Sequence, residues 1–264
     1  MGNERPKLLS IEIDALADGQ PAQLHGFASD ANDDWVATGW FQALVAAGYD
    51  VIAPDLRGHG LSSKSRNPRD YRLEAFAGDC IAAARFCWGH SSFSVVGYSM
   101  GAHIAMTLSL ANPDQIETLV LGGMGERIAA TVGLAPEFAD ALDAVAEHKL
   151  DTSALPSYAL RFAQHAALKS YNDLAVLAAC LRGQSCVFDL AKLAQVAAPT
   201  LVMVGENDKL AGAPYRVAGL FPVGIAATVP DVNHASALTS EPFRSRAMMH
   251  FGIAEPLGCN GGLS

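Results

Sequence analysis

The sequence predicts an α/β fold, with a mostly parallel, doubly wound sheet and an inserted helical lid. Short β-branched runs alternate with helical patterns along most of the chain, which is typical of a parallel sheet covered by helices. The alternation stops between residues 126 and 196, where only helical patterns occur, and two more strand patterns follow. We therefore expect residues 1–125 and 197–264 to form one core and residues 126–196 to form a lid.

The N-terminal half contains five predicted strands and three predicted helices. The strands are short apolar runs bounded by turn residues, and the helices carry apolar residues at helical spacing. Leu8–Ile13 alternates only weakly, so we expect it at a sheet edge. In chain order the strands are 8–13, 22–24, 50–54, 93–96 and 117–122, and the helices are 34–48, 73–88 and 102–108.

The C-terminal half begins with helices and then returns to strands. Asn172 is a candidate N-cap for the third helical block, and Gly183 is its candidate stop. We expect no strand among these blocks. The helical blocks are 137–150, 158–170 and 173–181, the strands are 199–205 and 225–229, and the last helix is 241–251.

Composition and charge argue against several classes of partner. The net charge is −9 and Lys and Arg form no run, so nucleic acid and anionic membrane surfaces are poor partners. No apolar stretch is long enough to cross a bilayer. Met1–Lys7 lacks the apolar core of a signal peptide, and the five cysteines show no C-x-x-C spacing. These features predict a cytoplasmic protein with reduced thiols, and they leave monomer and homo-oligomer open.

Gly97–Gly101, with the sequence Gly-Tyr-Ser-Met-Gly, matches the nucleophile-elbow pattern G-x-S-x-G. A predicted strand precedes it and a predicted helix follows it, which is the context that this motif requires. The sharp turn lifts the Ser99 hydroxyl into a cleft, and the helix N-terminus points N–H groups at an oxyanion formed there. The alternative is an ordinary strand-to-helix turn, since glycine and serine are common.

Four further motifs accompany the elbow in a fixed order. They are His25-Gly26-Phe27, the loop from Pro54 to Ser62, Gly205-Glu206-Asn207-Asp208 and Asn233-His234. With these motifs the chain resembles the α/β-hydrolase superfamily, in the single-domain branch with a small helical cap, from about residue 8 to residue 252.

The resemblance implies a catalytic triad in the order nucleophile, acid, base. Ser99 would be the nucleophile, His234 its general base, and Asp208 the acid that orients the imidazole. Glu126 and Glu206 are the alternative acids, because Glu126 follows the preceding strand and Glu206 is close to Asp208.

The resemblance also assigns the oxyanion hole to two backbone N–H groups, those of Phe27 and Met100. It implies neither a cofactor nor a metal. Arg57-Gly58-His59-Gly60 lacks metal-ligand spacing, and no Gly-x-Gly-x-x-Gly follows a strand.

A serine at the elbow implies acyl transfer through a serine ester, followed by attack of water. Relatives that open epoxides or remove halogen use an aspartate there, so Ser99 argues against both reactions. The lid has no arginine cluster beyond Arg161 and Arg182, which favours a small or medium, largely uncharged ester or lactone. Its candidate apolar contacts are Phe138, Leu142, Leu155, Tyr158, Phe162 and Tyr171.

Several other functions remain open on the same fold. They are C–C bond hydrolysis, cofactor-free haloperoxidation and acyl transfer to another acceptor. A function of another class is a receptor that keeps the triad and binds a ligand without turnover. The Ser99, Asp208 and His234 set favours an enzyme over the receptor.

Overall fold

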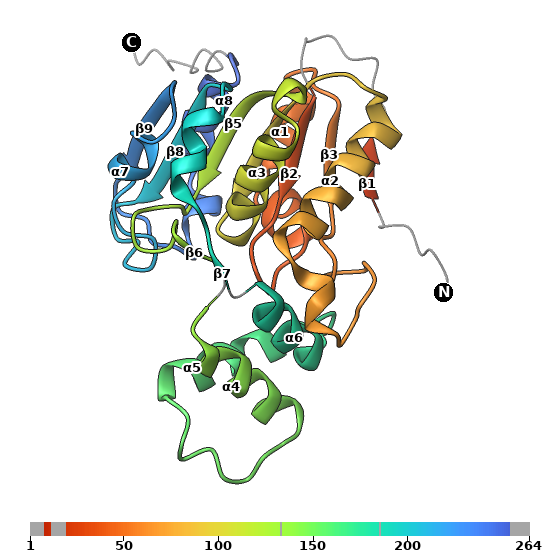
Figure 1. The fold of residues 1–264 in the computed structure, drawn as a ribbon, viewed down its shortest axis with the longest axis vertical. Coiled ribbons are helices and arrows are strands. Elements are labelled where there is room, and N and C mark those ends of the chain that lie inside the picture. Colours follow the sequence, from red (N-terminus) through yellow and green to blue (C-terminus); the bar gives the residue numbers. More distant parts are fainter. Residues whose placement is uncertain (1–7, 12–19, 133, 185, 254–264) are drawn as a thin grey trace, which may run out of the picture.

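A seven-stranded sheet forms the centre of the computed structural model, which describes residues 8–11, 20–132, 134–184 and 186–253 (Figure 1). Its strand order is β1-β3-β2-β4-β5-β8-β9, and only the edge strand β1 runs antiparallel to its neighbour. The strands are β1 (Leu8–Ile11), β2 (Pro21–Leu24), β3 (Val51–Pro54), β4 (Phe93–Tyr98), β5 (Ile116–Gly122), β8 (Thr200–Gly205) and β9 (Gly224–Val229). The prediction of a mostly parallel α/β sheet is therefore confirmed. The expected strand residues Glu12 and Ile13, and the two ends 1–7 and 254–264, lie outside the described residues.

Helices cover both faces of the sheet, which is why its central strands are apolar on both sides. Val95 of β4 packs into one buried cluster, with α2 and α3, and Val96 packs into the other, with α1 and α8. Every residue of β4 and β8 is buried. The helices are α1 (Trp40–Ala46), α2 (Leu73–Trp88), α3 (Met100–Ala111), the short α7 (Tyr215–Ala218) and α8 (Glu241–His250). In the described part of the chain, no helix has both the length and the apolar character that a bilayer span requires.

The predicted helix over 34–48 is wrong in one respect, because it is broken at Gly39. A π-helical turn covers Asn32–Val36, and α1 begins only at Trp40. Gly39 has φ of 82°, a left-handed conformation that glycine adopts without a Cβ clash. The break lets Trp35 and Trp40 pack edge to face, with ring centroids 5.5 Å apart, and both side chains are fully buried.

Three inserted helices lie beyond the carboxyl ends of the strands, below the sheet in Figure 1. They are α4 (Pro136–Ala146), α5 (Ser157–Ala167) and α6 (Leu174–Gln184), and they share a buried cluster that also includes Ala28. The expectation that this region holds no strand is wrong, since β6 (Thr131–Val132) pairs antiparallel with β7 (Cys186–Val187). Strands of two residues leave no alternation for a sequence pattern to detect.

Both ends predicted for the third helical block are also corrected. Asp173, not Asn172, caps α6, because its Oδ1 accepts hydrogen bonds from the N–H groups of Ala175 at 3.1 Å and Val176 at 3.2 Å. Gly183 lies inside α6 and does not stop it. A Cβ on Gly183 would lie 2.0 Å from the carbonyl oxygen of Pro68, so this glycine permits α6 to approach the 3-10 turn Pro68–Tyr71 closely.

Candidate active site

The elbow between β4 and α3 is a strained turn that requires its two glycines. Ser99 has φ of 53°, which is rare for a residue with a side chain. A Cβ on Gly97 would lie 2.3 Å from the carbonyl oxygen of Gly101, and a Cβ on Gly101 would lie 2.0 Å from that of Leu24. The sequence therefore places Ser99 between a strand and a helix that approach too closely for any other residue at those two positions.

The structure brings Ser99, His234 and Asp208 together. His234 Nε2 lies 3.0 Å from Ser99 Oγ, and its Nδ1 lies 2.7 Å from Asp208 Oδ2. Because a carboxylate only accepts hydrogen bonds, Nδ1 carries the proton and Nε2 is free to accept from the serine hydroxyl. This tautomer is the one that a general base requires.

Asp208 is held by the backbone of its own loop. Its Oδ1 accepts hydrogen bonds from the N–H groups of Leu210 at 3.1 Å and Ala211 at 2.8 Å, which leaves Oδ2 for the imidazole. The side chain is fully buried, whereas that of His234 is 24% exposed. The carboxylate is thus fixed in one orientation, and the histidine faces the cleft.

The two alternative acids do not contact His234. Glu126 Oε2 lies 3.6 Å from Arg216 Nε, and Glu206 Oε2 accepts a 3.5 Å hydrogen bond from the N–H of Asp231. Both side chains are exposed. Of the three acids considered, only Asp208 is in place to orient the base.

Tyr98 holds His234, the predicted base, and sequence analysis did not identify this contact. Its ring packs against that of His234 with centroids 5.3 Å apart, and its hydroxyl donates a hydrogen bond to the His234 carbonyl oxygen. Tyr98 fills a variable position of the elbow motif, so the motif itself gives no signal for it.

The predicted oxyanion donors, Phe27 and Met100, both line the same cavity as Ser99. Within the described residues, neither backbone N–H donates a hydrogen bond. Met100 is the first residue of α3, so its N–H lacks a helical partner. Both donors are therefore available to an oxyanion.

His25 directs the peptide group that carries the Phe27 N–H. The Leu56 N–H donates to His25 Nε2 at 2.9 Å, so the ring proton lies on Nδ1, which donates to the Gly26 carbonyl at 2.8 Å. In a trans peptide the C=O and the N–H point in opposite directions. Anchoring the Gly26 carbonyl thus aims the Phe27 N–H away from His25.

Asp34 fixes the same loop from its other side. Its Oδ2 accepts from the Gly26 N–H at 2.7 Å, and its Oδ1 accepts from the Ser29 hydroxyl at 2.5 Å. Sequence analysis did not identify this role. An aspartate beside the start of a helix is usually a capping residue, so its pattern gives no signal for a loop contact.

A cavity of about 330 Å³ opens beside Ser99. Of the six expected apolar contacts, only Phe162 lines it; Phe138, Leu142 and Leu155 pack inside the helical cluster instead. Tyr158 is exposed, and Tyr171 contacts Asp33. The apolar side chains that line the cavity include Phe27, Ile128, Leu134, Phe162, Leu181, Leu210 and Leu238, and the polar ones include Asp34, His103, His165, Lys169 and Gln184.

Two polar groups of the lining carry no free charge. Burial lowers the pKa of His103 to about 4, so the ring is neutral, and its Nε2 donates to the Ile128 carbonyl at 3.0 Å. Lys169 Nζ forms an ion pair with Asp33 at 2.8 Å. Among the described residues no cluster of His, Cys, Asp or Glu could hold a metal ion.

Comparison with known proteins agrees with this fold. The model of the alpha/beta hydrolase fold family matches residues 24–154. The chain is 36% identical over 118 residues to epoxide hydrolase B of Mycobacterium tuberculosis, covering 41% of this chain and 31% of that protein. The match thus spans less than a third of that curated relative.

Solved structures resemble nearly the whole chain. MenH from S. aureus has a TM-score of 0.69 at 20% identity, covering 93% of this chain and 97% of that one. The 2-hydroxy-6-oxo-6-phenylhexa-2,4-dienoate hydrolase from Rhodococcus sp. strain RHA1 has a TM-score of 0.66 at 17% identity, covering 89% and 90%. At these identities the likeness shows the fold alone.

Proposed function

Because this chain belongs to the α/β-hydrolase superfamily, we propose that it is a serine hydrolase of small or medium, largely uncharged carboxylic esters or lactones. One observation carries the proposal: His234 links the Ser99 hydroxyl to the buried Asp208 carboxylate at 3.0 and 2.7 Å. Residues 126–196, which include the inserted helices, would act as the lid over this site.

The reaction follows from the tautomer of His234. Nε2 takes the Ser99 proton as Oγ attacks the carbonyl carbon, and the new imidazolium is stabilised by Asp208. The N–H groups of Phe27 and Met100 stabilise the oxyanion. Collapse of the intermediate expels the alcohol, which receives the proton from Nε2. Water then attacks the acyl-enzyme by the same route and releases the acid.

The cavity supports an uncharged substrate. Its volume, about 330 Å³, is near the lower end of ligand pockets and suits a small or medium ester. Most of its lining is apolar, and the Lys169 charge is already paired with Asp33. Asp34 is a second carboxylate near Lys169, and it disfavours an anionic substrate group at this end of the cavity.

Ser99 also argues against the activity named for epoxide hydrolase B. Opening an epoxide through an ester intermediate needs a carboxylate nucleophile, whereas a serine hydroxyl would give an ether that water does not readily cleave. The matched part of that relative therefore supports the fold and not its reaction.

A panel of esters, thioesters and lactones, assayed with the native protein and Ser99→Ala, tests the proposal. We expect turnover of short-chain esters that falls by at least about 10³-fold in the variant. A fluorophosphonate should label the native protein and not Ser99→Ala. Ser92→Ala is the matched control, since Ser92 is half-buried, does not line the cavity and bonds Glu117.

The outcomes separate the alternatives. Full esterase activity in Ser99→Ala would contradict the proposal. Labelling of Ser99 without turnover of any member of the panel would favour the ligand-binding receptor.

A further inference from the structure

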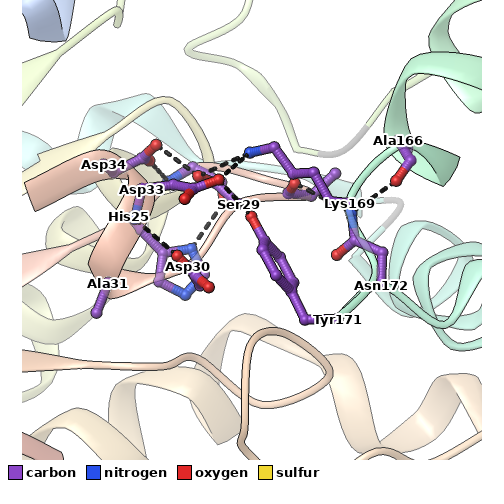
Figure 2. A network of polar contacts seen from close by, with 12 residues as sticks. His25, Ser29, Asp30, Ala31, Asp33, Asp34, Ala166, Lys169, Tyr171 and Asn172 are labelled. Atoms are coloured by element: carbon purple, nitrogen blue, oxygen red, sulfur yellow. Dashed lines mark hydrogen bonds and ion pairs between the residues drawn. The ribbon is translucent and has the colours of Figure 1, made fainter. Parts of the chain in front are cut away.

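The connection between α5 and α6 docks onto the loop that follows β2. Figure 2 shows Lys169, Tyr171 and Asn172 reaching this loop from the inserted helices. Lys169 Nζ lies 2.8 Å from Asp33 Oδ2, and the Tyr171 hydroxyl donates to the same oxygen at 2.7 Å. The two side chains thus hold a single carboxylate oxygen from the side of the inserted helices.

A chain of polar contacts leads from this docking point to the oxyanion peptide. Lys169 Nζ lies 3.5 Å from Ser29 Oγ, and that hydroxyl donates to Asp34 Oδ1 at 2.5 Å. The other oxygen of Asp34 holds the Gly26 N–H at 2.7 Å. Phe27, whose N–H is a proposed oxyanion donor, follows directly.

The loop needs support from outside itself. Ala28 has φ of 57°, a left-handed conformation that costs an alanine about 1 kcal/mol. Asn172 Nδ2 donates to the Ala28 carbonyl at 3.3 Å and also to that of Ala166 at 3.0 Å, so it ties the strained residue to α5.

Charge reinforces the docking. Burial alone would raise the pKa of Asp33, but hydrogen bonds from Lys169 and Tyr171 outweigh it and lower the pKa below its usual value. Asp33 is therefore ionised at neutral pH, and Lys169 is the cation that balances it. Removing Lys169 would leave Asp33 beside two other carboxylates, Asp30 and Asp34.

We propose that Lys169 and Tyr171 are positioning residues, which hold the loop after β2 so that the Phe27 N–H faces the cleft. The oxyanion site is then complete only while the inserted helices are docked, which couples lid docking to catalysis. This inference rests on the proposed hydrolase function for its effect on turnover, although the coupling itself can be measured without turnover.

The kinetic signature follows from what an oxyanion donor does. It interacts more strongly with the transition state than with the bound substrate, so displacing it lowers kcat more than it raises KM. We expect Tyr171→Phe and Lys169→Met each to lower kcat about tenfold, with KM changed less than about threefold. Lys169→Arg keeps the ion pair and should restore most of kcat.

Matched controls exist elsewhere in the inserted helices and their flanks. The Tyr158 hydroxyl donates to Glu137 at 2.5 Å, and Lys149 pairs with Glu147 at 3.1 Å, both away from the cavity. Tyr158→Phe and Lys149→Met remove the same kinds of contact and should leave kcat unchanged.

Hydrogen exchange read by mass spectrometry provides the measurement that needs no activity. Exchange in peptides covering residues 26–34 should accelerate at least about threefold in Tyr171→Phe and Lys169→Met, but not in the two controls. Unchanged exchange there in both variants would overturn the inference, even if their kcat falls. Faster exchange with no Ser99-dependent turnover in the native protein would support the coupling and count against the proposed hydrolase function alone.

Discussion

His25 shows how one buried side chain can set the direction of a peptide group, here the one that carries the proposed oxyanion donor of Phe27. Its Nδ1–H holds the Gly26 carbonyl, and its Nε2 accepts from the Leu56 N–H. We predict that His25→Ala lowers kcat about 10²-fold, because the Phe27 N–H loses its anchor. The unpaired Leu56 N–H should also reduce the free energy of unfolding by about 1–3 kcal/mol. Steady-state kinetics and urea unfolding measure the two effects, and an unchanged kcat would show that the loop needs no anchor from His25.

A second prediction concerns Asp208, whose two carboxylate oxygens have different hydrogen-bond partners. Oδ1 accepts two backbone N–H groups, so in Asp208→Asn the amide oxygen keeps that place and the amide NH₂ faces His234. The imidazole proton then moves to Nε2, which can no longer accept from Ser99. We predict a fall in kcat on the order of 10³- to 10⁴-fold with little change in KM.

The control for this change is Glu206→Gln. Glu206 is a nearby acid that is exposed and does not contact His234. Its kcat should match that of the native protein. Equal losses in the two variants would mean that Asp208 does not orient the base.

How well single residues could be predicted depends on whether a motif contains them. Ser99, Asp208 and His234 come from three motifs in a fixed order, and the structure places them in contact. Tyr98 and Asp34 could not be found this way. Tyr98 contacts His234 in the loop after β9, and Asp34 contacts Gly26 in the loop after β2. These contacts depend on the tertiary fold, and no local sequence pattern predicts them.

At the scale of elements, α6 and α2 provide a matched pair of helical glycines. Replacing a helix-interior glycine by alanine usually stabilises by about 0.5–1 kcal/mol. A methyl group added at Gly78 in α2 would extend into open space, so Gly78→Ala should follow that rule. In Gly183→Ala the new Cβ would meet the Pro68 carbonyl oxygen at 2.0 Å, so we predict destabilisation by about 1–3 kcal/mol. Urea unfolding of both variants measures the contrast, and equal shifts would refute the close approach of α6.

The same close contacts explain which elements the sequence could and could not predict. Long periodic patterns, such as Leu73–Trp88, are reproduced to the residue because burial on one face dictates their spacing. The expected helix is broken at Gly39, and this break lets Trp35 and Trp40 both be buried. Their burial depends on packing against the rest of the fold, which the local sequence does not show. The ribbon of β6 and β7 depends on pairing between segments far apart in the chain and has no local pattern.

At the scale of the whole molecule, the fold buries histidines in uncharged form. Burial lowers the pKa of His59 to about 3, and the nearby His25 ring, 5.3 Å away between centroids, adds to the effect. Burial lowers the pKa of His103 to about 4 and also lowers that of His250. In the unfolded chain each would titrate near 6.5. The folded state therefore excludes protons that the unfolded state binds.

The sign of the pH dependence follows from these shifts. Since the folded pKa values lie below the unfolded ones, the stability that they contribute is complete above pH 6.5 and is lost as the pH falls toward 4. Below about pH 6, each excluded proton costs about 1.4 kcal/mol per pH unit, so His59 and His103 together should lower the free energy of unfolding by roughly 3 kcal/mol per unit. This is a large fraction of a typical stability of about 5–15 kcal/mol. Urea unfolding at pH 7, 6 and 5 measures this slope.

His103→Gln keeps a donor for the Ile128 carbonyl and removes one titrating group, so its slope should be smaller by about one proton. A stability that stays flat between pH 7 and 5 would mean that these rings are protonated without cost, and their burial would then not constrain the fold.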